Sequence, residues 1–237
     1  MISITGLLHS VNSLPIRVIL TDDPMRVKML AAHWLDGAKL VYELRGNSGY
    51  VGKYGGNDVA LVSTGFGESA ALIYLHEAKM LGVRRVIYLG ECITFDESAM
   101  LRDVIIASGM DAELECCAQA VSRSLGIRAK VRSVFTDDRF PLNHTDGIKT
   151  GAGKASADDR FLFGQEYPEG GFLDFATAAI ASYAAENQLA ALSVLTVSQC
   201  YASGERIEEH ERQSRFHDAA RIAFETFAQD SRNDAGG

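Results

Sequence analysis

The chain has 237 residues, of which 47% are hydrophobic and 23% charged, so it is long enough to bury a substantial core. Its formal net charge of −8 argues against a nucleic-acid backbone or an anionic membrane surface as the main partner. Residues 1–15 show no basic region followed by a long apolar run, and no apolar stretch reaches membrane-spanning length, so a cytoplasmic protein is expected.

The first half of the chain alternates short β-branched runs with amphipathic stretches, which predicts alternating strands and helices. Pro24 favours a helix start, because its missing N–H is no loss in a first turn. The predicted strands are Arg17–Thr21, Lys39–Leu44, Tyr50–Tyr54 and Val59–Ser63. The predicted helices are Met25–Leu35 and Ser69–Leu81, the second preceded by a tight, glycine-containing loop.

The second half continues the same alternation. The predicted strands are Arg85–Leu89, Val104–Ala107, Ala129–Val134 and Ala191–Val197. The predicted helices are Ala112–Leu125, Phe175–Glu186 and Glu211–Phe227. Pro141–Gly171 is rich in glycine and is expected to be either a mobile lid or a disordered loop. The polar end, Asp230–Gly237, is expected to fray.

This pattern predicts an α/β fold: one domain over residues 1–237, with a mixed, mostly parallel twisted sheet flanked by helices. Ligands of such sheets bind at the carboxyl ends of the strands. The loops after Thr21, Ser63, Leu89, Val134 and Val197 are therefore the candidate site.

The cysteines are expected to be reduced thiols. Their spacing fits neither a zinc site nor a disulfide framework. They are Cys92, Cys116, Cys117 and Cys200.

Seven short motifs follow one another in the order found in one enzyme superfamily. Along the chain they are TDDPMR from Thr21, STGFGES from Ser63, YLGEC from Tyr88, LRDVII from Leu101, LDFATA from Leu173, TVSQ from Thr196 and ERQ from Glu211. These are similar to the P-G-D-P-x-R, G-T-G-I-G-G-P-S, R-V-G-T/S-C, (L/G)-x-D-(V/L)-(V/L)-I, V-E-M-E-(A/S)-A, T-V-S-D and E-R-Q motifs of the nucleoside phosphorylase/uridine phosphorylase superfamily. The resemblance covers about residues 15 to 228, and its combination of motifs is more specific for the fold than for the activity.

The resemblance implies a protein that cleaves the N-glycosidic bond of a nucleoside, usually with phosphate as nucleophile and without a metal or organic cofactor. It also implies a homo-oligomer, commonly a hexamer built from dimers that share active sites. In such an assembly His9 and Arg45 would act across an interface, His9 on the sugar and Arg45 on phosphate.

The expected phosphate positions are strongly altered. Arg26 and Cys92 match the family motifs. Asp22 replaces a glycine, Tyr88 replaces an arginine and Glu91 replaces a small hydroxyl residue. A carboxylate about 4 Å from a phosphate charge costs on the order of 4 kcal/mol at an effective dielectric near 20, so phosphate binding is in doubt.

Several roles remain open for the two carboxylates. They could pair with Arg26 and Arg45 and seal the site, orient a water molecule, or recognise a cationic ligand. A metal site formed by Asp22, Asp23 and Glu91 is a more remote alternative.

The sugar and base positions are altered as well. Asp174 keeps a carboxylate, either as a ribose ligand or as a helix N-cap, while Phe175 replaces a methionine and Ala176 replaces the glutamate that holds the ribose hydroxyls. Gln199 replaces the aspartate that contacts the base, so it can hydrogen-bond but cannot act as a general acid. The remaining candidate ligand contacts are Phe66, Phe140 and Arg212.

Two functions follow from this comparison. The first is a divergent enzyme that cleaves a nucleoside or related glycoside by atypical phosphorolysis or by hydrolysis, with Asp22, Glu91, Asp174 and Gln199 as candidate catalytic residues. The second is a catalytically inactive protein that keeps the fold for binding a small molecule or another protein. A segment that the family carries is also missing between Ile106 and Ala112, which predicts an incomplete wall of the pocket or of a subunit contact.

Overall fold

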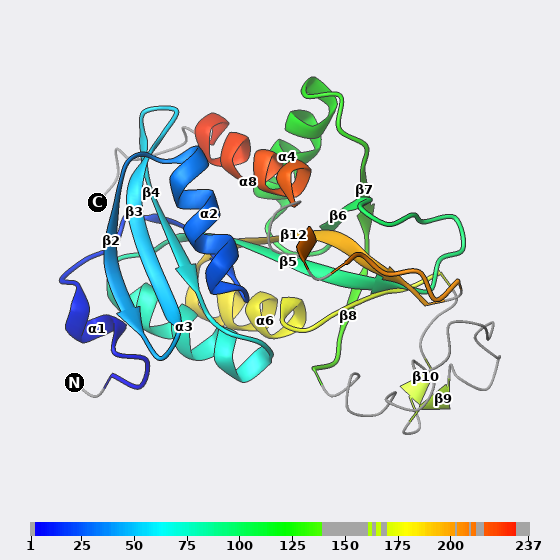
Figure 1. The fold of residues 1–237 in the computed structure, drawn as a ribbon, viewed down its shortest axis with the longest axis horizontal. Helices are drawn as coiled ribbons and strands as arrows, with labels where there is room; N and C mark the ends of the chain where they lie inside the picture. The colour runs from blue at the N-terminus through cyan, green and yellow to red at the C-terminus, as the bar shows by residue number, and fades with distance from the viewer. Residues whose placement is uncertain are drawn as a thin grey trace.

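A computed structural model of the chain describes residues 3–138, 161–162, 165–166, 170–201, 203–208, 210–211 and 216–230. These residues form one ten-stranded sheet with helices on both faces, and a separate two-stranded ladder of β9 (Phe161–Leu162) and β10 (Gln165–Glu166) (Figure 1). The α/β class with a mixed, mostly parallel sheet is as predicted. None of the described helices is long and apolar enough to cross a lipid bilayer.

The main sheet has the order β2-β3-β4-β1-β5-β12-β6-β7, with β11 paired to both β5 and β8. Its strands are β1 (Arg17–Thr21), β2 (Asp36–Leu44), β3 (Asn47–Tyr54), β4 (Asn57–Ser63), β5 (Arg85–Thr94), β6 (Val104–Ala107), β7 (Ala129–Arg132), β8 (Val134–Thr136), β11 (Phe172–Asp174) and β12 (Ala190–Cys200). The central strands β4, β1, β5 and β12 run parallel, so their carboxyl ends share one edge of the sheet.

Two sets of helices cover the two faces (Figure 1). On one face lie α1 (Leu7–Ser10), α3 (Glu68–Met80) and α6 (Thr177–Asn187). On the other face lie α2 (Pro24–Trp34), α4 (Ala112–Ser124) and α8 (His217–Gln229). Alternate residues of a strand enter the two cores, because side chains of a strand point alternately to opposite faces: in β1, Val18 and Leu20 pack with the α3 side and Ile19 with the α2 side.

The predicted elements are present, with four corrections. β5 extends to Thr94, beyond the predicted end at Leu89, because its distal half gains pairing partners in β11 and β12. The predicted strand Ala129–Val134 is divided into β7 and β8, which pair with different strands. The last helix, α8, begins at His217 rather than Glu211.

The fourth correction concerns the C-terminal end. Asp230 was expected to fray, but it is fully buried and its carboxylate pairs with Arg85, while its carbonyl accepts a 2.9 Å hydrogen bond from Arg17. The short helix α1 and the strands β9, β10 and β11 were not predicted. Residues 141–160 of the expected lid or disordered loop, and 231–237 of the tail, lie outside the described residues.

Candidate functional site

The candidate site lies where the loops that follow β1 and β4 meet. The backbone N–H of Thr64, directly after β4, donates a 2.8 Å hydrogen bond to the carbonyl of Thr21 at the end of β1. This bond places the β1 loop next to the turn that leads into α3. Both loops lie at the carboxyl edge, where the sequence predicted the site.

Arg26 is the central cation of this edge. Arg26 lies in the first turn of α2, whose N-cap is Asp23. The Asp23 carboxylate accepts hydrogen bonds from the N–H groups of Met25 and Arg26, and Pro24 is the first residue of the helix. The Arg26 side chain is buried, and its Nη1 donates to Thr21 Oγ1 at 2.9 Å and to Asp22 Oδ1 at 2.8 Å.

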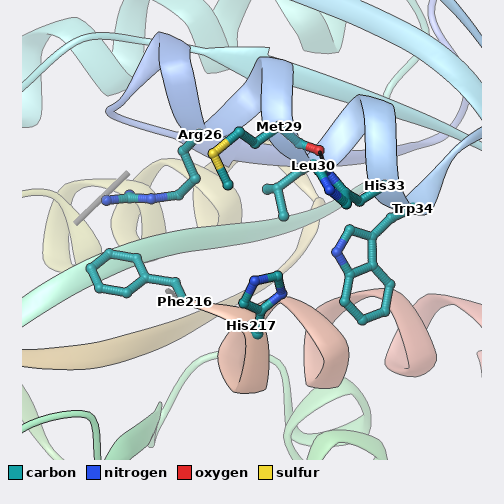
Figure 2. A pocket seen from close by; sticks show the side chains of 7 residues that line it. All are labelled: Arg26, Met29, Leu30, His33, Trp34, Phe216 and His217. Atoms are coloured by element: carbon teal, nitrogen blue, oxygen red, sulfur yellow. Dashed lines mark hydrogen bonds between the residues drawn. The ribbon is translucent and has the colours of Figure 1, made fainter. Parts of the chain in front are cut away.

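Two further groups complete the surroundings of Arg26. Glu91 Oε1 on β5 is 4.0 Å from Arg26 Nη2, and the guanidinium carbon lies 4.1 Å from the centroid of the Phe216 ring (Figure 2). A cation over an aromatic face is attracted by the partial negative charge on the face of the ring. Arg26 is therefore compensated by two carboxylates and an aromatic ring of its own chain.

Arg45 does not join this cluster. It lies exposed at the turn between β2 and β3, with φ +54°, and its guanidinium is 3.4 Å from the carbonyl of Ile4. The suggested pairing of Asp22 and Glu91 with both arginines is thus seen for Arg26 alone, because the hairpin holds Arg45 at a separate position. His9 is also exposed, in the last turn of α1.

Tyr88 fills the core beside this charged cluster. Its side chain is buried, and its ring packs over Gly90, where an added Cβ would lie 2.5 Å from the ring. Burial raises the pKa of the Tyr88 phenol well above its usual value, Asp22 and Asp174 raise it further, and Arg26 opposes them. The phenol is therefore neutral and supplies no positive charge where the resemblance expected an arginine.

Asp174 holds together the start of α6 and the end of β8. Its fully buried carboxylate accepts hydrogen bonds from the Thr177 N–H at 2.9 Å, the Ala176 N–H at 3.4 Å and the Thr136 hydroxyl at 2.5 Å. Burial raises the pKa of Asp174 to about 6, although the hydrogen bonds from Thr136, Thr177 and Ala176 lower it. Asp174 lies two residues before Ala176, the N-cap residue of α6, and its carboxylate binds the first N–H groups of the helix, which is close to the N-cap role that was one of its two open roles.

A carboxylate also lies at the start of α3. Asp138, which follows β8, accepts a 3.2 Å hydrogen bond from the N–H of Glu68. Gly67, just before the helix, has φ +95°, and a Cβ there would be 3.0 Å from Asp138 Oδ2. A glycine is thus needed for the backbone conformation and for the close approach of the carboxylate.

Two aromatic rings lie beside these carboxylates. Phe66 in the turn before α3 contacts Phe175, next to Asp174, with ring centroids 4.5 Å apart. Phe66 is 53% exposed, whereas Phe175 is 6% exposed. The exposed ring gives this edge an apolar surface on which a planar base could stack.

The remaining predicted site residues are distributed as follows. Cys92 is fully buried in the core, and burial raises the pKa of its thiol well above the usual value. Gln199 is half-buried at a bulge of β12. Phe140 and Arg212 lie outside the described residues.

Three residues of the site were not found from the sequence: Thr136, Asp138 and Phe216. The rule on strand ends selected the loop after Val134, but no spacing indicates that Asp138 reaches a helix seventy positions away along the chain. Phe216 was placed inside a predicted helix, and it instead precedes α8 and faces Arg26.

A hollow lies beside Arg26, between α2 and the start of α8 (Figure 2). Its lining residues are Arg26, Met29, Leu30, His33, Trp34, Phe216 and His217. Within the described part of the chain, no group of three or more His, Cys, Asp or Glu side chains is arranged to hold a metal ion, and this includes the remote alternative at Asp22, Asp23 and Glu91.

Comparison with known proteins identifies the family of the chain. Residues 16–230 match the family model of the phosphorylase superfamily. The chain is 31% identical over 235 residues to the DeoD-type purine nucleoside phosphorylase of Thermoanaerobacter sp. (strain X514), covering 90% of this chain and 95% of that protein. It is 29% identical over 231 residues to the DeoD-type enzyme of Oceanobacillus iheyensis, covering 89% of this chain and 93% of that protein. Because the family match spans nearly the whole described sheet, the chain belongs to the phosphorylase superfamily.

Proposed function

We propose that this protein binds a nucleoside or a related N-glycoside at the carboxyl edge of the sheet and transfers the glycosyl group to water rather than to phosphate. The observation that carries the proposal is the 2.8 Å ion pair between Asp22 and Arg26, with Glu91 nearby. A phosphate dianion approaching Arg26 would meet two carboxylates that already compensate its charge.

Water suits such a site better than phosphate. A neutral nucleophile is not repelled by Asp22 or Glu91, and a carboxylate oxygen can accept its proton as the oxygen attacks the sugar carbon. The N-glycosidic bond then breaks, and the departing base takes a proton from solvent, because Gln199 can donate a hydrogen bond but not a proton. The exposed Phe66 ring supplies a surface for the base.

Binding without cleavage is the second candidate. It is favoured by Ala176, which offers no acceptor to the ribose hydroxyls, and by Asp174, whose carboxylate is already engaged by Thr136, Ala176 and Thr177. A ribose bound there would lose about 2–4 kcal/mol of transition-state stabilisation compared with a site that holds its hydroxyls through a carboxylate.

The relatives suggest the first substrates to test, since they are named purine nucleoside phosphorylases. A panel of purine and pyrimidine nucleosides would be incubated with the protein in chloride buffer, with and without inorganic phosphate, and free base would be quantified by chromatography. Base release at the same rate in both buffers, with free pentose as co-product, supports hydrolysis. Release that requires phosphate and yields pentose 1-phosphate contradicts the proposal.

Two variants make the experiment sharper. Asp22→Asn and Glu91→Gln each keep the side-chain volume but remove a proton acceptor, so one of them should lower the rate by about 10²–10⁴-fold. Glu186→Gln, exposed near the C-terminal end of α6, is the matched control and should keep the full rate. No base release from any nucleoside, combined with a raised melting temperature in the presence of one of them, supports the binding function instead.

A further inference from the structure

One side of β5 is unpaired over a short stretch near the carboxyl end of the sheet. On this side β1 pairs with β5 as far as Tyr88, which lies opposite Leu20, and β11 resumes the pairing at Ile93. The chain leaves β1 for α2 on one face of the sheet and leaves β11 for α6 on the other. Sheets of this kind bind ligands where neighbouring strands turn away to opposite faces. Residues 89–92 of β5 are therefore the floor of the candidate site.

The Tyr88 side chain points along this unpaired stretch. Its ring lies over Gly90, where an added Cβ would be 2.9 Å from the ring carbon Cζ and 3.0 Å from the hydroxyl oxygen. Tyr88 is 2% exposed, and none of the residues that the structure describes forms a hydrogen bond with its hydroxyl. Buried hydroxyls in proteins are nearly always hydrogen-bonded, because an unpaired one is costly. The phenol therefore has a donor to offer at the floor of the site.

Two carboxylates flank this hydroxyl, and only Asp22 has an oxygen left to accept a bond. Asp22 follows β1 and Asp174 ends β11, and after burial these two groups raise the pKa of the Tyr88 phenol most, Asp22 first. Both oxygens of Asp174 already accept hydrogen bonds at the start of α6. Asp22 binds Arg26 through Oδ1, whereas no residue in the described part of the chain donates to its Oδ2.

Tyr88 and Asp22 offer complementary groups without bonding to each other. The neutral phenol donates and the free carboxylate oxygen accepts, and a water molecule can accept from the first while it donates to the second. Polar groups that influence each other without a direct hydrogen bond are commonly bridged by such a molecule. A phosphate dianion suits this pair poorly, because Asp22 would repel it.

We propose that Tyr88 is a catalytic residue of this site, whose hydroxyl donates a hydrogen bond to the attacking water molecule while Asp22 accepts one from it. The inference rests on the proposed function and adds the group that orients the nucleophile. The water oxygen bonds to the sugar carbon as its proton passes to Asp22 Oδ2. The C–N bond breaks, and its electron pair leaves with the base, which takes a proton from solvent. Tyr88 keeps its own proton throughout.

The inference also distinguishes the two candidate proton acceptors. Side chains alternate between the faces of a strand, and Tyr88 packs in the core on the α3 side, whereas Leu89 packs on the α2 side. Glu91 shares the face of Leu89 and so lies on the opposite face from Tyr88. Asp22→Asn should therefore lower the rate more than Glu91→Gln does.

Tyr88→Phe is the decisive variant, because it removes the hydroxyl and keeps the ring over Gly90. Base release from adenosine and from inosine is measured in chloride buffer without phosphate. The variant should lower kcat by about tenfold, the effect of one lost hydrogen bond, with KM and the melting temperature unchanged. Adding it to Asp22→Asn should cost much less than it does in wild type, because the two groups hold the same water molecule.

Tyr50→Phe is the matched control. Tyr50 is a half-buried residue of β3 on the α2 side, and its hydroxyl likewise has no hydrogen-bond partner within the described residues. This variant should keep the wild-type kcat and KM.

A high-resolution crystal structure supplies a readout that does not depend on activity. Wild type crystallised without phosphate should hold a water molecule within hydrogen-bond distance of both the Tyr88 hydroxyl and Asp22 Oδ2. The Tyr88→Phe crystal should lack that molecule, while the ring keeps its place over Gly90.

Three results overturn the inference: no such water molecule in wild type, full activity of Tyr88→Phe, or a raised KM with unchanged kcat, which would mean that the hydroxyl binds the nucleoside instead. Base release without phosphate by a wild type that lacks this water molecule leaves the proposed function standing and removes Tyr88 from it. The water molecule in place, with no base released from any nucleoside, contradicts the proposed function and leaves the contact of Tyr88 with water standing.

Discussion

Glu77 shows how one buried carboxylate fixes the N-terminal segment. On α3, its two oxygens accept hydrogen bonds from the Ser3 and Thr5 hydroxyls and from three backbone N–H groups of residues 4, 5 and 8. Burial alone would raise the pKa of Glu77, but the hydrogen bonds from Ser3, Thr5 and Leu8 outweigh burial and lower it to about 2. The ionised form therefore stabilises the fold.

Glu77→Gln should lower the free energy of unfolding by about 2–3 kcal/mol at pH 7, because an amide cannot accept all five bonds and brings two donors of its own. Since the pKa is lower in the folded state, this stabilisation is full above the unfolded pKa near 4.5 and is lost as the pH falls towards 2. Urea unfolding at pH 7 and at pH 3 measures both effects. The exposed Glu97→Gln is the control, and an equal loss in both variants would contradict this role of Glu77.

Asp174 has the opposite pH dependence. Its pKa is raised to about 6 in the folded state by burial, so folding favours the protonated form. The contribution is full below the unfolded pKa of 3.8 and is lost as the pH rises through 6, by on the order of 3 kcal/mol in total. Asp174→Asn should remove this pH-dependent part, as measured by unfolding between pH 4 and 8. A variant with the same pH dependence as wild type would show that another group titrates.

At the level of elements, α8 is held at its end by buried charges. Asp230 directly follows the helix, and its carboxylate pairs with Arg85 while its carbonyl binds Arg17. These arginines face each other at the starts of β1 and β5. The last residue of the described chain is thus tied to two central strands, which is why it does not fray.

Asp230→Ala should lower the free energy of unfolding by about 3–5 kcal/mol, because it removes a fully buried carboxylate from its ion pair with Arg85, whose side chain is only 17% exposed. Hydrogen exchange should increase most in the last turn of α8, since that turn loses its anchor to the sheet. Asp218→Ala, in the exposed first turn of the same helix, is the control and should change stability by less than about 1 kcal/mol. Equal effects of the two substitutions would contradict the anchor.

Helices and strands were predicted correctly where the local sequence carries the signal. They were missed where hydrogen bonding to a strand distant in sequence determines whether a segment is a strand. β1 and β6 were predicted to the residue, because β-branched runs bounded by turn residues carry the information locally. The distal half of β5 is a strand because β11 pairs with it, and β11 itself has three residues. Such short strands depend on neighbours that are distant in sequence, and no periodicity reveals them.

For the whole molecule, the sequence selected residues of the candidate site but not their contacts. Asp22 and Arg26 were selected from one motif and Glu91 from another, and the fold places Arg26 2.8 Å from Asp22 and 4.0 Å from Glu91. The cap by Asp138 and the ring of Phe216 could not be predicted, because each depends on how a loop returns to the sheet. Motifs identify which residues belong to the candidate site, whereas the hydrogen-bond and ring contacts of these residues depend on tertiary structure.

The fold also leaves apolar side chains exposed along one border of the sheet. β2 is the terminal strand of the described sheet order, and on it Leu40 and Leu44 are 49% and 45% exposed, while the neighbouring Ile4 is 60% exposed. An exposed strand with apolar side chains is an unfavourable surface for a monomer, and a second copy of the chain can cover it. We therefore expect a homo-oligomer, with β2 and the N-terminal segment in the interface.

Leu40→Lys tests this expectation, because it places a charge in the centre of the apolar border without disturbing a buried residue. Analytical ultracentrifugation should give a multiple of the 25.7 kDa chain mass for wild type and a shift towards the monomer for the variant. Met100→Lys is the matched control: Met100 is 61% exposed but lies before β6, away from β2, and the variant should keep the wild-type mass. A monomeric wild type would contradict the expectation directly. Loss of the oligomer in both variants would mean that added charge, rather than the β2 border, controls association.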